Sequence, residues 1–209
     1  MKNLFLTLAF TLTSLASFGQ FLKDDALYIS PSIGGGDYFY FGVSLDYIIN
    51  EKYSIGISGL SGMRNAKSTP EDYDMGVING IFTFGTNRPM DYTNIFQFLV
   101  GRTFILSKDK DVRANLMLGL SISEKQSPSN WVWVNQGAFL ENYLYEQESY
   151  WSAGLILKPK LEIPFSRFFG ISFSPFLVLS QEVNYGCTLD FNLGKVRNRN
   201  SKNMVQKTK

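Results

Sequence analysis

Residues 112–123, VRANLMLGLSIS, decide the fold class, because apolar side chains occupy every second position of the stretch. A period of two is typical of a β-strand, whose successive side chains point to opposite faces. The same alternation returns in residues 38–49, 151–163 and 183–193, so the sequence predicts an all-β chain. Three further stretches follow the pattern loosely and one is apolar with an ambiguous phase: residues 27–33, 53–63 and 169–180, and residues 93–106.

Short turn-forming segments separate these stretches. Most contain Gly, Asn, Asp, Pro or Ser, which favour tight turns, and they lie at residues 34–37, 50–52, 108–111, 164–167 and 181–182. Strands joined by short turns are antiparallel neighbours. No amphipathic helical stretch of convincing length follows residue 19, which disfavours a parallel β-α-β architecture. We expect up-and-down antiparallel connections.

The composition of the two strand faces favours a transmembrane barrel over a soluble sandwich or a lipocalin-like barrel. A soluble sheet has a polar face rich in Lys, Glu and Thr, whereas here that face holds mainly Gly, Ser, Asn and Tyr. The four clear strands run for 11 to 13 residues, and a tilted strand crosses a bilayer in about 9 to 11. Aromatic side chains near the strand ends fit the interfacial girdles of such a barrel.

The number of strands depends on two long segments. With eight strands, residues 65–91 and 125–149 form outer loops of 27 and 25 residues. Residues 76–84 and 131–145 inside them are β-prone, and counting both gives ten strands. Counting only one would place the two ends of the barrel on opposite sides of the membrane. We expect eight to ten strands, with a slight preference for ten.

The two ends of the chain differ from its body. Residues 1–19 combine Lys2, an apolar run and the small residues Ser17 and Gly19, which predicts a signal peptide cleaved before Gln20. Residues 20–194 form the predicted barrel. Residues 195–209 carry six Lys and Arg and no acidic residue, which predicts a basic, disordered tail.

Six ionisable side chains fall on the small-residue face and so point into the predicted lumen. Buried charges must be paired or hydrated to be tolerated, so an internal ion-pair plug is favoured, and a charged constriction that selects small solutes is the alternative. In an eight-stranded barrel all six lie in the periplasmic half; with ten strands the arginine moves to the outer side. The six residues are Asp46, Arg113, Lys158, Lys160, Glu162 and Asp190.

The residue inventory excludes several classes of function. The 209 residues include no histidine and one cysteine, Cys187, so catalytic Ser-His-Asp and Cys-His sites and His-ligated metals are unavailable. A net charge of +2 is too small for a nucleic-acid surface. We predict no enzymatic activity, no cofactor and no metal.

Four segments carry a resemblance: residues 159–170 (PKLEIPFSRFFG), 70–73 (PEDY), 193–197 (LGKVR) and 184–191 (NYGCTLDF). The chain resembles small outer-membrane β-barrel proteins of the Gram-negative Bacteroidota, over most of its predicted mature length. Residues 184–191 also resemble the last-strand signal that barrel-assembly machinery reads, although 18 residues follow Phe191. The resemblance implies a location in the outer membrane, contact with its lipids and insertion by that machinery.

We therefore expect an outer-membrane barrel, favoured as a monomer, with a structural or surface-interaction role through its long outer loops. The alternatives are a narrow, porin-like passive channel and a soluble periplasmic lipid-binding β-barrel. The candidate contact residues in the second long loop are Trp131, Trp133, Tyr143 and Tyr145.

Overall fold

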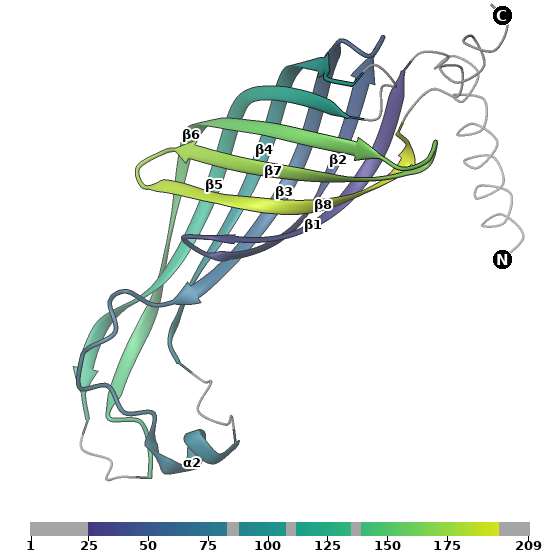
Figure 1. Cartoon of the computed structure of the whole chain (residues 1–209). Coiled ribbons are helices and arrows are strands. Elements are labelled where there is room, and N and C mark those ends of the chain that lie inside the picture. Colours follow the sequence, from purple (N-terminus) through teal and green to yellow (C-terminus); the bar gives the residue numbers. More distant parts are fainter. Residues whose placement is uncertain (1–24, 83–87, 108–111, 135–138, 197–209) are drawn as a thin grey trace, which may run out of the picture.

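A computed structural model of the chain describes residues 25–82, 88–107, 112–134 and 139–196. Its strands close into one barrel in which each strand pairs antiparallel with the next and the last pairs with the first (Figure 1). The eight strands are β1 (Ala26–Gly36), β2 (Phe39–Ile49), β3 (Tyr53–Asn65), β4 (Met90–Ile105), β5 (Arg113–Trp133), β6 (Tyr143–Pro164), β7 (Phe169–Leu179) and β8 (Val183–Lys195). The predicted all-β, up-and-down barrel is confirmed.

The preference for ten strands is wrong, and eight is the number in the described chain. Residues 76–82 of the first β-prone segment form a short helix, α2 (Gly76–Phe82). Residues 131–145 add no strand, because they hold the end of β5 and the start of β6, which pair with each other at Val132 and Leu144. The β-propensity of this segment correctly predicted strand structure, but its residues lengthen the β5–β6 hairpin instead of forming a new strand. Within the described ranges, no helix is long and apolar enough to cross a membrane.

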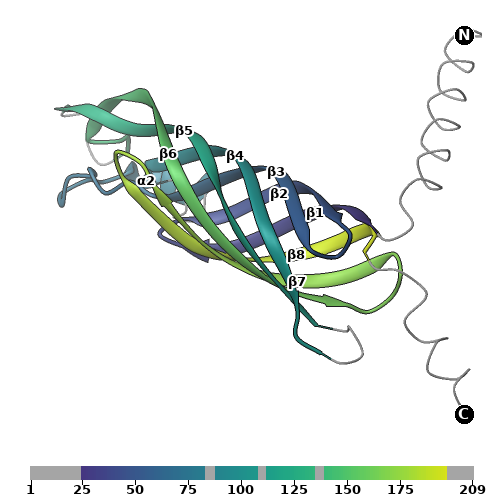
Figure 2. The ribbon, with the colours of Figure 1, turned by 90° about the horizontal axis from the view of Figure 1, so that it is seen from above.

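The alternation of the sequence separates the inner and outer faces of the barrel wall. In β5, Met117 is 1% exposed and faces the lumen, whereas its neighbour Leu118 is 56% exposed on the outside. The ambiguous residues 93–106 follow the same rule, since Leu99 is buried and Phe98 is exposed. Seen along a second direction, the strands cross the barrel obliquely (Figure 2). The outward apolar side chains form a continuous belt over several strands.

The two ends of the barrel differ. At one end, here called the terminal end, β1 begins, β8 ends, and residues 50–52 and 165–168 make short turns. At the other, the hairpin end, β5 and β6 continue as a two-stranded ribbon that projects away from the barrel (Figure 1). The last contact of β6 with β7 is Leu155 with Leu179, so residues 143–154 of β6 pair with β5 alone.

The last strand ends at Lys195, and the next residue, Val196, is buried against Ala26, Tyr28 and Ile48. Lys195 still pairs with Leu27 of β1. The predicted signal peptide, residues 1–19, and residues 197–209 of the predicted tail lie outside the described residues and stay predictions.

Leu118→Arg tests whether the outward belt faces hydrocarbon. Leu118 lies between Leu116 and Leu120 on the outside of β5, and an arginine at the bilayer midplane destabilises a barrel by about 2–4 kcal/mol. We expect Leu118→Arg to lower the free energy of unfolding in phospholipid vesicles by that amount, measured by urea titration, and Leu118→Phe to leave it nearly unchanged. The reverse order would indicate a surface packed against protein.

Candidate functional site

The lumen is filled in three layers along the barrel axis. A small apolar cluster of Ala26, Tyr28, Ile48 and Val196 closes the terminal end. A layer of charged and polar side chains follows. Toward the hairpin end lies a larger apolar cluster of Tyr38, Tyr40, Leu60, Ile95, Leu99, Met117, Ile156, Phe176 and Val178. An eight-stranded barrel is just wide enough for side chains to fill it.

The first group in the charged layer centres on Glu162, which is 0% exposed. Arg113 donates from Nη2 to Glu162 Oε2 at 2.7 Å. The hydroxyl of Tyr28 donates to the other carboxylate oxygen, Oε1, also at 2.7 Å. Arg113 and Glu162 are directly opposite each other on β5 and β6, so the strand register itself brings the two charges together.

The second group centres on Lys160, whose Nζ donates to Asp46 Oδ2 at 2.9 Å and lies 4.0 Å from Asp190 Oδ2. Asp46 also accepts a hydrogen bond from Ser44 at 2.8 Å. Asp190 accepts hydrogen bonds from two hydroxyl groups, those of Ser174 and Thr188. The Lys160 ammonium lies 5.0 Å from the centre of the Tyr28 ring, which connects the two groups.

Lys158 is 4% exposed and makes no hydrogen bond or ion pair with any residue that the structure describes. It lies beside a break in the wall, because β6 and β7 pair at Leu157 and again only at Leu161. Pro159 and Pro175 fall in this gap, and proline has no backbone N–H to donate.

The structure thus places all six predicted lumen residues inside the barrel, in its terminal half. Three cations and three anions give the group a net charge of zero when all are ionised. Sequence reasoning missed the apolar layer above them, although Tyr38, Tyr40 and Ile156 already stood on the small-residue face. Tyr40 and Phe176 meet edge to face there, with ring centres 5.0 Å apart. Among the described residues, no group of three or more Cys, Asp or Glu could hold a metal ion.

A smaller charged contact joins β5 and β6 to the β7–β8 turn at the hairpin end of the barrel. Lys125 and Tyr150 donate to the carboxylate of Glu182 in the β7–β8 turn, at 2.6–2.7 Å. Burial raises the pKa of Glu182, but these hydrogen bonds outweigh it and hold the pKa below its ordinary 4.5. A lowered carboxyl pKa stabilises the fold above pH 4.5, and this contribution is lost as the pH falls through the lowered value.

The projecting ribbon carries the four predicted contact residues. Trp131 packs against Tyr145 at 4.9 Å between ring centres, and against Tyr143 and Tyr73 at 6.2 and 6.0 Å. Trp131 and Tyr143 thus hold the β3–β4 loop against the ribbon. Trp133, 58% exposed, and Tyr145, 38% exposed, remain accessible to a partner.

Polar contacts fix the β3–β4 loop to the ribbon. The Tyr143 hydroxyl donates to the carboxylate of Asp72 at 2.9 Å. Asn142 donates from Nδ2 to the Asp72 carbonyl and accepts at Oδ1 from the Asp74 amide, both at 2.7 Å. The Ile78 amide of α2 donates to the Phe139 carbonyl at 3.2 Å. The loop and the hairpin therefore form one module.

The outer end of this module exposes apolar side chains among acidic ones. Its described residues, 66–82, 127–134 and 139–148, hold one lysine, Lys67, against six carboxylates, a net charge of −5. We call the exposed apolar side chains, which are 43–67% accessible, the apolar tip: Val77, Ile78, Ile81, Val132, Trp133, Phe139, Leu140 and Leu144.

Two solved barrel structures are similar to this chain. The N-terminal β-barrel domain of OprF from Pseudomonas aeruginosa is 10% identical, with a TM-score of 0.51, and the match covers 82% of this chain and 97% of that domain. Ail, the attachment invasion locus protein of Yersinia pestis, is 13% identical, with a TM-score of 0.44, over 81% of this chain and 94% of that one. No family model and no curated protein matches the chain. The chain is thus similar in fold to the OprF barrel domain.

The Arg113–Glu162 pair offers a direct test of the lumen network. Removing one member of a buried ion pair costs about 3–5 kcal/mol, because the other charge stays buried without a partner. We expect Arg113→Leu to destabilise the folded barrel by that amount, and Arg113→Leu with Glu162→Leu to recover most of it, as measured by urea unfolding. A double variant no more stable than Arg113→Leu would show that the two charges do not depend on each other.

Proposed function

We propose that the chain is an outer-membrane barrel that holds the projecting module above the bilayer, where the apolar tip docks a protein partner. The observation that carries this proposal is the apolar tip itself. Apolar side chains exposed together on a protein surface mark interaction sites. Here the exposed apolar side chains lie at the far end of a built module, on α2 and on both faces of the β5–β6 ribbon, where Val132 pairs with Leu144 and Trp133 pairs with Tyr143.

The outward belt supports a membrane location over a soluble periplasmic lipid-binding barrel. Leu118 and Leu155 are 56% and 60% exposed on the outer wall, with similar side chains around them. A water-soluble barrel would place such residues inside. Residues 184–191 lie in β8, the last strand of the barrel, where the predicted assembly signal acts.

The packed lumen argues against a narrow channel. The apolar cluster fills the hairpin half, and paired charges fill the terminal half. A solute would have to displace both layers. We propose that five of the six charges, Arg113 with Glu162 and Lys160 with Asp46 and Asp190, act as an ion-pair plug that fixes the barrel shape, rather than as a constriction that selects solutes.

The charge around the apolar tip indicates the chemistry of the partner. Glu146 and Glu148 lie on β6 next to Leu144, and the module carries −5 overall. Electrostatic complementarity therefore favours a protein segment with basic side chains around an apolar face. An anionic membrane surface would be repelled.

Cysteine labelling in intact cells tests the location and orientation. Cys187 is the chain's single cysteine, so Cys187→Ala provides a background for one new cysteine at a time. We expect a membrane-impermeant maleimide to label Leu144→Cys in intact cells, and Lys52→Cys, in the β2–β3 turn, only after lysis. Labelling of both positions only after lysis would contradict surface exposure of the module.

Peptide binding tests the chemistry of the apolar tip. The probe is a fluorescent peptide of alternating Lys and Leu, added to the full chain in phosphatidylcholine nanodiscs. Losing one large buried apolar contact weakens binding on the order of tenfold, so we expect that loss for Trp133→Ser, and weaker binding at high salt. Phe168→Ser is the control, because Phe168 is 61% exposed at the opposite end of the barrel. Equal weakening by both variants would contradict docking at the tip.

A further inference from the structure

On the described strands β3 to β5, the outer wall of the barrel carries a polar row at the edge of the apolar belt that is nearer the hairpin end. Ser61 on β3 pairs with Asn94 on β4, and Asn94 pairs with Glu124 on β5. The row continues into aromatic residues on both sides, Phe41 on β2 and Trp151 on β6. We call Ser61, Asn94 and Glu124 the polar row.

Hydrogen bonds join the polar row to itself. The Ser61 hydroxyl donates to Asn94 Oδ1 at 2.8 Å. Asn94 Nδ2 donates to Glu124 Oε2 at 3.4 Å, and Gln126 Nε2 donates to Glu124 Oε1 at 3.2 Å. The polar side chains of the row thus have their hydrogen-bond partners on the outer wall itself. Each oxygen keeps a lone pair for a further donor.

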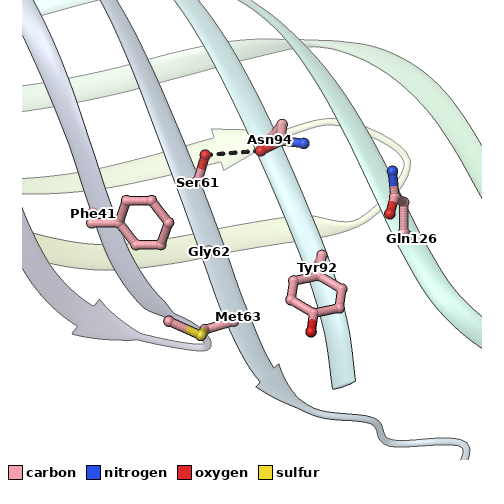
Figure 3. Close-up of a pocket in the computed structure, with 7 residues that line it drawn as sticks. All are labelled: Phe41, Ser61, Gly62, Met63, Tyr92, Asn94 and Gln126. Carbon is pink, nitrogen blue, oxygen red and sulfur yellow. Dashed lines mark hydrogen bonds between the residues drawn. The ribbon is translucent and has the colours of Figure 1, made fainter. Parts of the chain in front are cut away.

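A groove of about 350 Å³ lies over Ser61 and Asn94, two residues of the polar row, and Glu124 adjoins it through its hydrogen bonds to Asn94 and Gln126 (Figure 3). Figure 3 shows Phe41, Met63 and Tyr92 around it, with the amides of Asn94 and Gln126 on the side of β4 and β5. Apolar walls with a few converging polar groups are the usual make-up of a ligand site. Aromatic side chains at the edge of an apolar belt are typical of the level at which lipid head groups lie.

The next row toward the terminal end provides a surface for acyl chains. Gly59, Phe96, Ile122 and Ala153 follow one another across β3 to β6. Phe96 and Ile122 are 60% and 54% exposed, while Gly59 and Ala153 contribute little bulk at the two sides. One lipid can therefore place its head group on the polar row and its chains on this apolar row.

The charges select the type of head group. None of the residues that line the groove, Phe41, Ser61, Gly62, Met63, Tyr92, Asn94 and Gln126, is a cation. The nearby cations are engaged elsewhere, Arg64 with Asp91 at 2.9 Å and Lys125 with Glu182 at 2.6 Å. A phosphate would meet the Glu124 carboxylate without a countercharge. Hydroxyl groups, in contrast, can donate to Glu124 and Asn94.

We propose that this groove binds the sugar head group of a glycolipid in the outer leaflet. The proposal rests on the proposed membrane location, and it adds a specific lipid site that the belt alone does not require. Sugar hydroxyls donate to the Asn94 carbonyl in the groove and to the adjoining Glu124 carboxylate, and the aromatic side chain of Tyr92 borders the ring. Trp151 is the strand partner of Glu124 beside the groove.

Fluorescence quenching by brominated lipids tests the site. The chain has three tryptophans, so Trp131→Phe with Trp133→Phe leaves Trp151, at the end of the polar row, as the reporter. The full chain is placed in phosphatidylcholine vesicles that contain 10 mol% of a dibrominated lipid as the stated probe. This lipid is a monoglycosyl diacylglycerol, phosphatidylglycerol or phosphatidylcholine.

We expect the glycolipid to quench Trp151 with an apparent affinity roughly threefold to tenfold above that of phosphatidylcholine, the range for one or two added hydrogen bonds. Asn94→Leu and Glu124→Leu should remove this preference while the barrel still folds, because leucine suits the outer wall. Gln181→Leu is the matched control, since Gln181 is exposed in the β7–β8 turn, away from the groove.

Three results would overturn the proposal. Equal quenching by glycolipid and phosphatidylcholine would show that the groove has no lipid preference, while the membrane location still stands. Stronger quenching by phosphatidylglycerol would assign the groove to a phosphate. No quenching by any of the three lipids would show that Trp151 does not contact lipid, and would reject the membrane location as well.

Discussion

The structure depends on one constraint, the pairing of every strand edge within the belt. In the proposed membrane location, hydrocarbon offers no partner for a free N–H or C=O group, so the sheet must close on itself. Here β8 closes on β1, and eight strands fix the width of the barrel. Local interruptions at Pro159 and Pro175 are compatible with closure because the proline nitrogens have no hydrogen to satisfy.

The narrow width in turn decides what the lumen can hold. Little water fits between the walls, so most of the buried charges have a countercharge within a few ångströms, as Arg113 has in Glu162 and Lys160 in Asp46. Among the described residues, Lys158 is the exception. The apolar layer above them resembles the core of a soluble domain. The barrel therefore has a fixed, filled interior, and the parts of the molecule that remain free to bind are its outer wall and its projecting module.

The sequence was enough to predict the barrel, the inward or outward direction of side chains in the clearly alternating strands, and the six charged positions on the inner face, because a period of two is a local signal. The phase of residues 93–106 stayed ambiguous until the structure placed Leu99 inside and Phe98 outside. The ion pairs could not be derived, since Arg113 and Glu162 meet only through a register set 49 residues apart. The preference for ten strands, which counted residues 131–145 as a strand, was wrong for a related reason. β-Propensity does not distinguish a new strand from the extension of an existing one. The polar row was also hidden, because Ser61, Asn94 and Glu124 adjoin one another only in the closed sheet.

The projecting ribbon raises a separate problem, since a two-stranded hairpin in water is marginally stable on its own. Beyond the barrel, β5 and β6 lose their outer neighbours, and the β3–β4 loop takes over part of that role. Trp131 packs on Tyr73, and Asn142 binds the loop backbone at two points. The loop length that first suggested extra strands is thus explained by packing: residues 66–82 form a second layer against the two-stranded ribbon and bring α2 to its tip.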